Sequence, residues 1–174
     1  MSGQVFISYR RDDEKYAAGR LYDHLSQHFP KNQIFIDVDN LEPGVDFIEA
    51  IEASVGSCDA LIAVIGKRWL TSTDQEGKRR LDNPEDFVRL EIATALKRNI
   101  RVIPVLVDGA LMPRSSDLPD NLQPLVRRNA LDVSHNRFNA DSGRLLAVLE
   151  KVLEKADAER KQRQEKEPTK IGGL

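Results

Sequence analysis

The stretch "ALIAVIG", residues 60–66, decides the fold class of this chain. Its side chains are continuously apolar rather than alternating, as expected for a strand that is buried on both faces of a parallel sheet. Four other short runs are rich in β-branched and aliphatic residues: "QVFIS" (4–8), "QIFID" (33–37), "IRVIPVLV" (100–107) and "ALDV" (130–133). The sequence therefore predicts five short strands, most of them buried on both faces.

Helical patterns separate these strands. They cover residues 12–28, 46–56, 86–96 and 139–156. The second of them starts at Asp46, a good N-cap residue. Because strands and helices alternate along most of the chain, we expect an α/β, flavodoxin-like fold in which helices cover both faces of a parallel sheet.

The third helix carries an unexpected charge. In "DNPEDFVRLEIATAL" (82–96), Asn83 is predicted as the N-cap and Pro84 as the first helical residue. Glu91 lies one turn after Phe87 and one turn before Ala95, so its carboxylate is on the same face of the helix as these apolar neighbours. Such a position favours either a functional carboxylate or a solvated helix charge.

Two features fit the pattern less well. Pro104 lies inside the fourth predicted strand, where its missing N–H is tolerated best near a sheet edge or a bulge. The segment 108–129 is long for a loop, and "LPDNLQPL" within it predicts a helical turn. We also expect Trp69 to be a core or interface residue rather than a substrate-stacking surface, and Cys58 to be a small buried residue.

Composition limits the classes of function. The chain has 174 residues, enough for about one domain, and its 31% of charged residues nearly cancel to a net charge of −2. The electrostatic field of the protein is therefore expected to be too weak to attract nucleic acid. A single cysteine and three scattered histidines predict neither a disulfide nor a metal site. The start "MSGQVFISYRR" lacks a signal peptide, and no apolar run could span a bilayer, so we expect a cytoplasmic protein without membrane contact.

The C-terminal tail differs from the rest of the chain. After Leu153, no aliphatic or aromatic side chain larger than alanine appears before Ile171, except for one proline. We therefore expect a folded domain over residues 3–153 and a charged helical extension or linker, partly disordered, over 154–174. Whether another module follows is open.

Polar segments follow the first two strands. "SYRRDD" (8–13) and "DVDNLEPGVD" (37–46) come at strand ends, and the third helix begins at the same edge of the predicted sheet. Open parallel sheets bind ligands beyond the carboxyl ends of their strands. Glu91 is thus predicted to face a crevice lined by Tyr9, Arg10, Arg11 and the loop 38–46.

Five motifs point to one family. "VFISYRRDD", "IFIDVDNLEPGVDF", "CDALIAVIG", "DFVRLEI" and "VIPVLVDG" resemble, in order and spacing, the motifs of Toll/interleukin-1 receptor (TIR) domains, particularly those of bacteria. The resemblance covers roughly residues 3–153. It implies a five-stranded sheet in the order 2-1-3-4-5 and identifies the segment around "DNLEPG" (39–44) as the mobile BB loop, which is used in self-association.

The resemblance also implies an activity. Many TIR domains cleave NAD+ as a substrate, not as a cofactor, to nicotinamide and linear or cyclic ADP-ribose, and become active when the BB loop of one subunit completes the pocket of the next. Their catalytic glutamate often ends a W-x-x-x-E pattern, which falls here on Glu91, with Phe87 in place of the tryptophan. The site residues implied are Glu91 for catalysis and Tyr9, Arg10, Arg11, Leu41, Glu42, Gly44 and Phe87 for substrate binding.

The chemistry suits a lone carboxylate. Cleavage of the nicotinamide–ribose bond leaves positive charge on the sugar carbon, which a nearby carboxylate stabilises. Nicotinamide leaves as a neutral molecule, so no general acid is needed. The product isomer, the activating signal and the assembly geometry stay open.

Other interpretations remain. Arg10 and Arg11 fit surface charges as well as ligand contacts. "LEPGVD" (41–46) predicts a type II turn with Pro43 at position i+1 and Gly44 at position i+2. Asp37 and Asp39 suggest a phosphoacceptor, but a receiver carries its acceptor after the third strand, where this chain reads "AVIGKRW" without a carboxylate. The competing functions are a non-enzymatic adaptor that binds other TIR domains, and an enzyme resembling the nucleoside 2-deoxyribosyltransferases.

Overall fold

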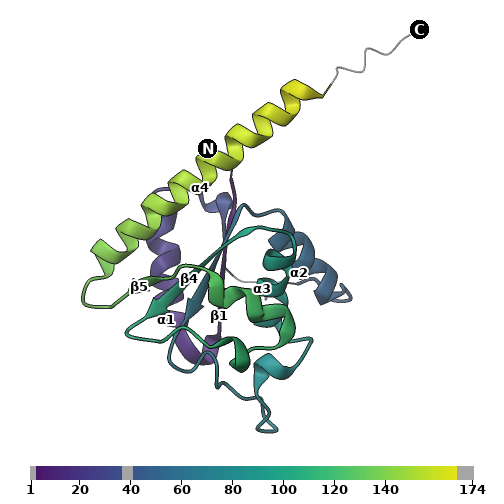
Figure 1. Ribbon diagram of the computed structural model, residues 1–174, viewed down its shortest axis with the longest axis vertical. Coiled ribbons are helices and arrows are strands. Elements are labelled where there is room, and N and C mark those ends of the chain that lie inside the picture. The colour runs from purple at the N-terminus through teal and green to yellow at the C-terminus, as the bar shows by residue number, and fades with distance from the viewer. Residues whose placement is uncertain (1–2, 37–40, 168–174) are drawn as a thin grey trace.

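A five-stranded parallel sheet forms the centre of the computed structural model, which describes residues 3–36 and 41–167 (Figure 1). The strand order is β2-β1-β3-β4-β5, and every neighbouring pair is parallel. This confirms the predicted fold class and strand order. The strands are β1 (Val5–Tyr9), β2 (Ile34–Phe35), β3 (Ala60–Ile65), β4 (Arg101–Val107) and β5 (Leu131–Val133).

Helices cover both faces of the sheet (Figure 1). Helices α1 (Arg11–Ser26) and α4 (Phe138–Lys166) pack on one face, and α2 (Phe47–Gly56) and α3 (Phe87–Lys97) pack on the other. The connections contain the 3₁₀ turns η1 (Lys31–Gln33), η2 (Arg80–Asp82), η3 (Ser115–Asp117) and η4 (Asp120–Arg127). The result is the three-layer arrangement that the alternating pattern predicts.

Alternation along the strands divides the core into two clusters. Val5 and Ile7 of β1 contribute to the cluster under α1 and α4, whereas Phe6 contributes to the cluster under α2 and α3. All six residues of β3 are buried, which explains why "ALIAVIG" is apolar at every position. Trp69 and Cys58 lie in the second cluster, as predicted.

Aspartates are the N-cap residues of two helices. Asp46 caps α2, as predicted, and accepts hydrogen bonds from the backbone N–H groups of Ile48 (2.9 Å) and Glu49 (3.3 Å). The prediction that Asn83 caps α3 is wrong, because α3 begins at Phe87 and its N-cap is Asp86. Asn83 follows η2 in extended conformation, and its side chain accepts from the Glu85 N–H in a separate turn.

The sheet explains how Pro104 is accommodated. Pro104 pairs with Ala63 of β3, while the pairing of β4 with β5 begins one residue later, at Val105. The proline therefore lies where β4 has an open side, as its missing N–H requires. The predicted helical turn in the long connection is also confirmed, because "LPDNLQPL" contains most of η4.

The last helix is longer than the predicted 139–156. It continues to Lys166 and projects beyond the sheet (Figure 1). Arg160 ties this extension to the domain through an ion pair with Asp59 just before β3, with 2.7 Å between Nη1 and Oδ1. Residues 168–174 of the tail lie outside the described residues. In the part of the chain that is described, no helix has the length and apolarity needed to cross a bilayer.

Candidate functional site

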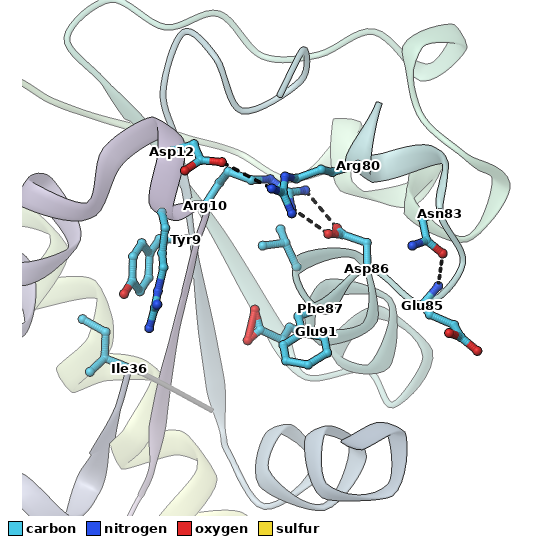
Figure 2. A pocket seen from close by; sticks show the side chains of 12 residues that line it. Tyr9, Arg10, Asp12, Ile36, Arg80, Asn83, Glu85, Asp86, Phe87 and Glu91 are labelled. Carbon is cyan, nitrogen blue, oxygen red and sulfur yellow. Dashed lines mark hydrogen bonds and ion pairs between the residues drawn. The ribbon is translucent and has the colours of Figure 1, made fainter. Parts of the chain in front are cut away.

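A pocket of about 430 Å³ opens at the carboxyl end of β1, beside the start of α3 (Figure 2). Its volume is in the range of small-molecule sites, about 300–1,000 Å³. It lies at the edge of the sheet where the sequence predicts a ligand crevice. The lining residues are Tyr9, Arg10, Arg11, Asp12, Ile36, Arg80, Asn83, Glu85, Asp86, Phe87, Val88 and Glu91.

Glu91 is the buried carboxylate of this pocket. It lies in the second turn of α3, and only 6% of its surface is exposed. Its Oε1 accepts a hydrogen bond of 3.0 Å from the hydroxyl of Ser8, which is itself buried in β1. The interpretation of Glu91 as a solvated helix charge is therefore wrong. A charge is costly to bury, so its position needs hydrogen bonds such as this one.

Arg10 and Asp86 form a buried ion pair beside Glu91 (Figure 2). The guanidinium and the carboxylate meet in bidentate geometry, with distances of 2.7 Å from Nη1 to Oδ1 and 2.9 Å from Nη2 to Oδ2. Asp86 also accepts from the Arg89 N–H at the start of α3. The Nε of Arg10 is buried and has no hydrogen-bond partner among the described residues. The pair thus fixes α3 against the end of β1.

Aromatic rings lie at the start of α3. Phe87 is 38% exposed, lines the pocket, and contacts Phe47 of α2 with 5.1 Å between ring centroids. Phe47 directly follows the loop that contains Gly44. The two rings meet at an angle of 34°, so the phenyl group of Phe87 is extended by a second aromatic ring.

The rim of the pocket is charged. Arg80, from η2, reaches across to Asp12 at the start of α1, with 3.5 Å between Nη2 and Oδ2 (Figure 2). Arg11 and Glu85 also line the pocket. Three arginines and four carboxylates therefore surround the same space, so the pocket can meet a ligand that carries both signs of charge.

The structure brings together most of the predicted site residues. Tyr9, Arg10, Arg11, Phe87 and Glu91 line the one pocket. The other three, Leu41, Glu42 and Gly44, are absent from its described lining. Asp37 and Asp39 lie outside the described residues.

The turn predicted for "LEPG" is present. Gly44 has φ 86°, and the Val45 N–H donates to the Glu42 carbonyl at 3.2 Å. Positive φ at the third position is the requirement of a type II turn that glycine meets without strain. The loop therefore leads from β2 into α2 through a defined bend just before Asp46.

Among the polar residues that the sequence analysis did not single out for the site are Ser8, Asp86 and Arg80. Ser8 could have been noticed as the polar residue in the buried run "VFIS", since a hydroxyl in a core strand needs a partner. Asp86 could have been noticed as an alternative N-cap. Nothing in the local sequence marks Arg80 as a pocket residue. Among the described residues, no group of histidine, cysteine or carboxylate side chains has the arrangement to hold a metal ion.

Comparison with known proteins identifies relatives over nearly the whole chain. The family model described as TIR domain matches residues 5–147. The chain is 30% identical over 166 residues to the NAD(+) hydrolase SARM1 of Danio rerio, a match that covers 95% of this chain and 22% of that protein. It is 27% identical over 136 residues to the NAD(+) hydrolase sarm1 of Drosophila melanogaster, covering 78% of this chain and 9% of that protein. The chain thus spans less than a quarter of the length of these relatives.

Solved structures share the fold at low identity. The TIR domains of the activated Roq1 resistosome align with a TM-score of 0.57 and 17% identity, covering 87% of this chain and 99% of that chain. A C. gigas TIR-STING receptor in complex with 2′,3′-cGAMP aligns with a TM-score of 0.53 and 18% identity, covering 82% and 39%. A prokaryotic SEFIR domain aligns with a TM-score of 0.53 and 17% identity, covering 84% and 97%.

Proposed function

Because the chain belongs to the TIR domain family, we propose that it is an NAD+ glycohydrolase, which cleaves the bond between nicotinamide and ribose. The observation that carries this proposal is the buried carboxylate of Glu91 in a pocket at the ligand-binding edge of the sheet. Two relatives named NAD(+) hydrolases support it, because one matches 95% and the other 78% of this chain.

Glu91 acts on the sugar in the proposed reaction. The bond between C1′ of the ribose and the nicotinamide nitrogen breaks, and its electron pair leaves with neutral nicotinamide. The Glu91 carboxylate stabilises the positive charge that develops on C1′, an interaction that strengthens where water is excluded. A water oxygen then bonds to C1′ and loses a proton, which gives ADP-ribose; attack by an adenine nitrogen instead gives the cyclic product.

The pocket has chemistry for both ends of the substrate. NAD+ carries a positive pyridinium ring and a negative pyrophosphate, and the lining offers both carboxylates and arginines. In this proposal Phe87 stacks on the nicotinamide ring, with Phe47 behind it. Tyr9 and Arg11 contact the remainder of the substrate. Arg10, which lines the same pocket, contributes positive charge to the binding surface.

Self-assembly activates the enzyme in this proposal. Leu41, Glu42 and Gly44 belong to the BB loop and are absent from the described lining of their own pocket. We infer that the loop of one subunit completes the pocket of the next, so that an isolated subunit is nearly silent. The proposed setting is bacterial immune or stress signalling in the cytoplasm.

Clustered protein tests the proposed activity. Wild type and Glu91→Ala are concentrated on beads and incubated with NAD+, and nicotinamide and ADP-ribose products are identified by mass spectrometry. The expected loss in Glu91→Ala is roughly hundredfold or more, because the variant lacks the main electrostatic stabiliser of the transition state. Glu150→Ala, which removes an exposed carboxylate of α4, is the matched control and keeps wild-type activity. Equal NAD+ consumption by wild type and Glu91→Ala contradicts the proposal.

A non-enzymatic adaptor is the second candidate. Phe87 favours it, because phenylalanine offers a smaller stacking surface than the tryptophan of the family pattern. Light scattering and NAD+ consumption together distinguish the two candidates. The variants are Gly44→Pro, which cannot adopt φ 86°, and Gly77→Pro, which places the same strain (φ 78°) in a turn outside the pocket lining. Assembly that only Gly44→Pro abolishes, without NAD+ loss in any state, selects the adaptor.

A further inference from the structure

Ser8 is a polar residue on an apolar face of the sheet. Along β1, Phe6 and Ser8 face α2 and α3, and the neighbouring strand β3 presents Leu61, Ala63 and Ile65 to the same side. Only 1% of the surface of Ser8 is exposed. A hydroxyl at such a position costs free energy unless it is hydrogen-bonded, so its partner determines what the serine is for.

The partner is the carboxylate of Glu91. The Ser8 hydroxyl donates to Oε1 at 3.0 Å across 83 residues of sequence. The register partner of Ser8 on β3 is Ala63, a core residue whose side chain is a single methyl group. A larger apolar residue at position 8 would occupy space next to the carboxylate and offer it no donor. Strand β1 thus presents a hydroxyl, not a bulky apolar group, to Glu91.

We propose that Ser8 is a positioning residue for Glu91 in NAD+ cleavage. This inference rests on the proposed function. A carboxylate has about four acceptor sites on its two oxygens, so a hydrogen bond to Oε1 restrains its rotation and leaves acceptor capacity for the sugar. The donor is attached to a central strand, whereas Glu91 has three rotatable bonds. Ser8 therefore fixes the direction in which the negative charge faces the reacting C1′.

This role predicts an effect on turnover rather than on substrate binding. Ser8 is absent from the described lining of the pocket, so its removal deletes no contact from the substrate's binding surface. Loss of its hydrogen bond removes one restraint on the carboxylate and weakens the stabilisation that develops only in the transition state. Such a change lowers kcat and leaves KM nearly unchanged.

The experiment compares two buried serines in clustered protein. Ser8→Ala removes the donor to Glu91, and Ser142→Ala removes another buried hydroxyl, which donates to the Phe138 carbonyl within α4. Thermal melts establish that both variants are folded. We expect Ser8→Ala to lower kcat about 10- to 100-fold with KM within about twofold, and Ser142→Ala to keep the wild-type kcat. Ser8→Cys, which keeps the shape but donates weakly, should fall between wild type and Ser8→Ala.

A double-mutant cycle separates positioning from a general loss of stability. If Ser8 acts through the carboxylate, Ser8→Ala has little further effect on the residual rate of Glu91→Gln. An equal fractional loss in both backgrounds overturns the inference, as does a wild-type kcat in Ser8→Ala. Failure of the proposed function is distinguishable, because in that case clustered wild type and Glu91→Ala consume NAD+ equally.

Discussion

Asp86→Asn is expected to destabilise the fold sharply, because it leaves Arg10 charged and buried without its counterion. The side chains of this pair are only 5% and 8% exposed, and two hydrogen bonds of 2.7 and 2.9 Å join them. Removing one partner of such a pair costs about 3–5 kcal/mol. For a chain of this length, that loss corresponds to a Tm decrease of roughly 6–20 °C.

Replacement of Asp86 by asparagine removes the ion pair but keeps the N-cap of α3. Asp86 also accepts from the Arg89 N–H, and asparagine is about as good an N-cap as aspartate. Asp86→Ala removes both functions and should cost about 1 kcal/mol more. The double variant Arg10→Met/Asp86→Asn contains no buried unpaired charge, so it should lose less stability than the two single variants together.

Urea unfolding followed by circular dichroism measures these free energies of unfolding. A loss below about 1 kcal/mol in Asp86→Asn would mean that the pair is solvated and weak, as exposed ion pairs are. Additive losses in the double variant would mean that the two side chains do not depend on each other. Either result refutes the view that this pair holds α3 against β1.

Three further predictions concern other parts of the fold. The Ser134 backbone N–H, which donates to Asp141, holds the pKa of that carboxyl below its ordinary value, so Asp141→Asn should lower stability at neutral pH, and the difference from wild type should shrink below about pH 4 in urea titrations. Burial raises the pKa of the Cys58 thiol to about 12, so thiol reagents at pH 8 should modify the folded protein far more slowly than the urea-unfolded chain; equal rates would contradict this. Gly66→Ala should cost about 1–3 kcal/mol in thermal melts, because the new Cβ would lie 2.5 Å from Oδ1 of Asp13, whose carboxylate is held by the Arg68 N–H at Oδ1 and by the Gly66 N–H at Oδ2.

The strands and the edge that carries the site were predictable, because they depend on local patterns. Continuous apolar runs identify buried strands, and a strand-to-helix alternation leaves few topologies. The position of Glu91 on an apolar seam also followed from helical periodicity alone. The rule that strand ends share one edge of the sheet predicted the crevice that Glu91 shares with Tyr9 and Arg10, whereas the sequence left the burial of Glu91 open.

The contacts that define the site depend on residues far apart in the chain. Ser8 bonds to Glu91 across 83 positions, and Arg10 pairs with Asp86 across 76. No local periodicity encodes such pairings. The error at Asn83 has the same origin, because asparagine and aspartate are comparable caps by propensity, whereas in the fold Asp86 both caps α3 and neutralises a buried arginine.

The most direct test of the central claim is the rate of nicotinamide release by clustered wild type and by Glu91→Gln. Glutamine keeps the size of the side chain and can still accept from Ser8, so the comparison removes the negative charge and little else. We expect wild-type clusters to release nicotinamide and the variant to be slower by roughly hundredfold or more, with unchanged assembly. Nicotinamide release at the same rate from both proteins would contradict the role of Glu91 as the charge that stabilises the sugar cation.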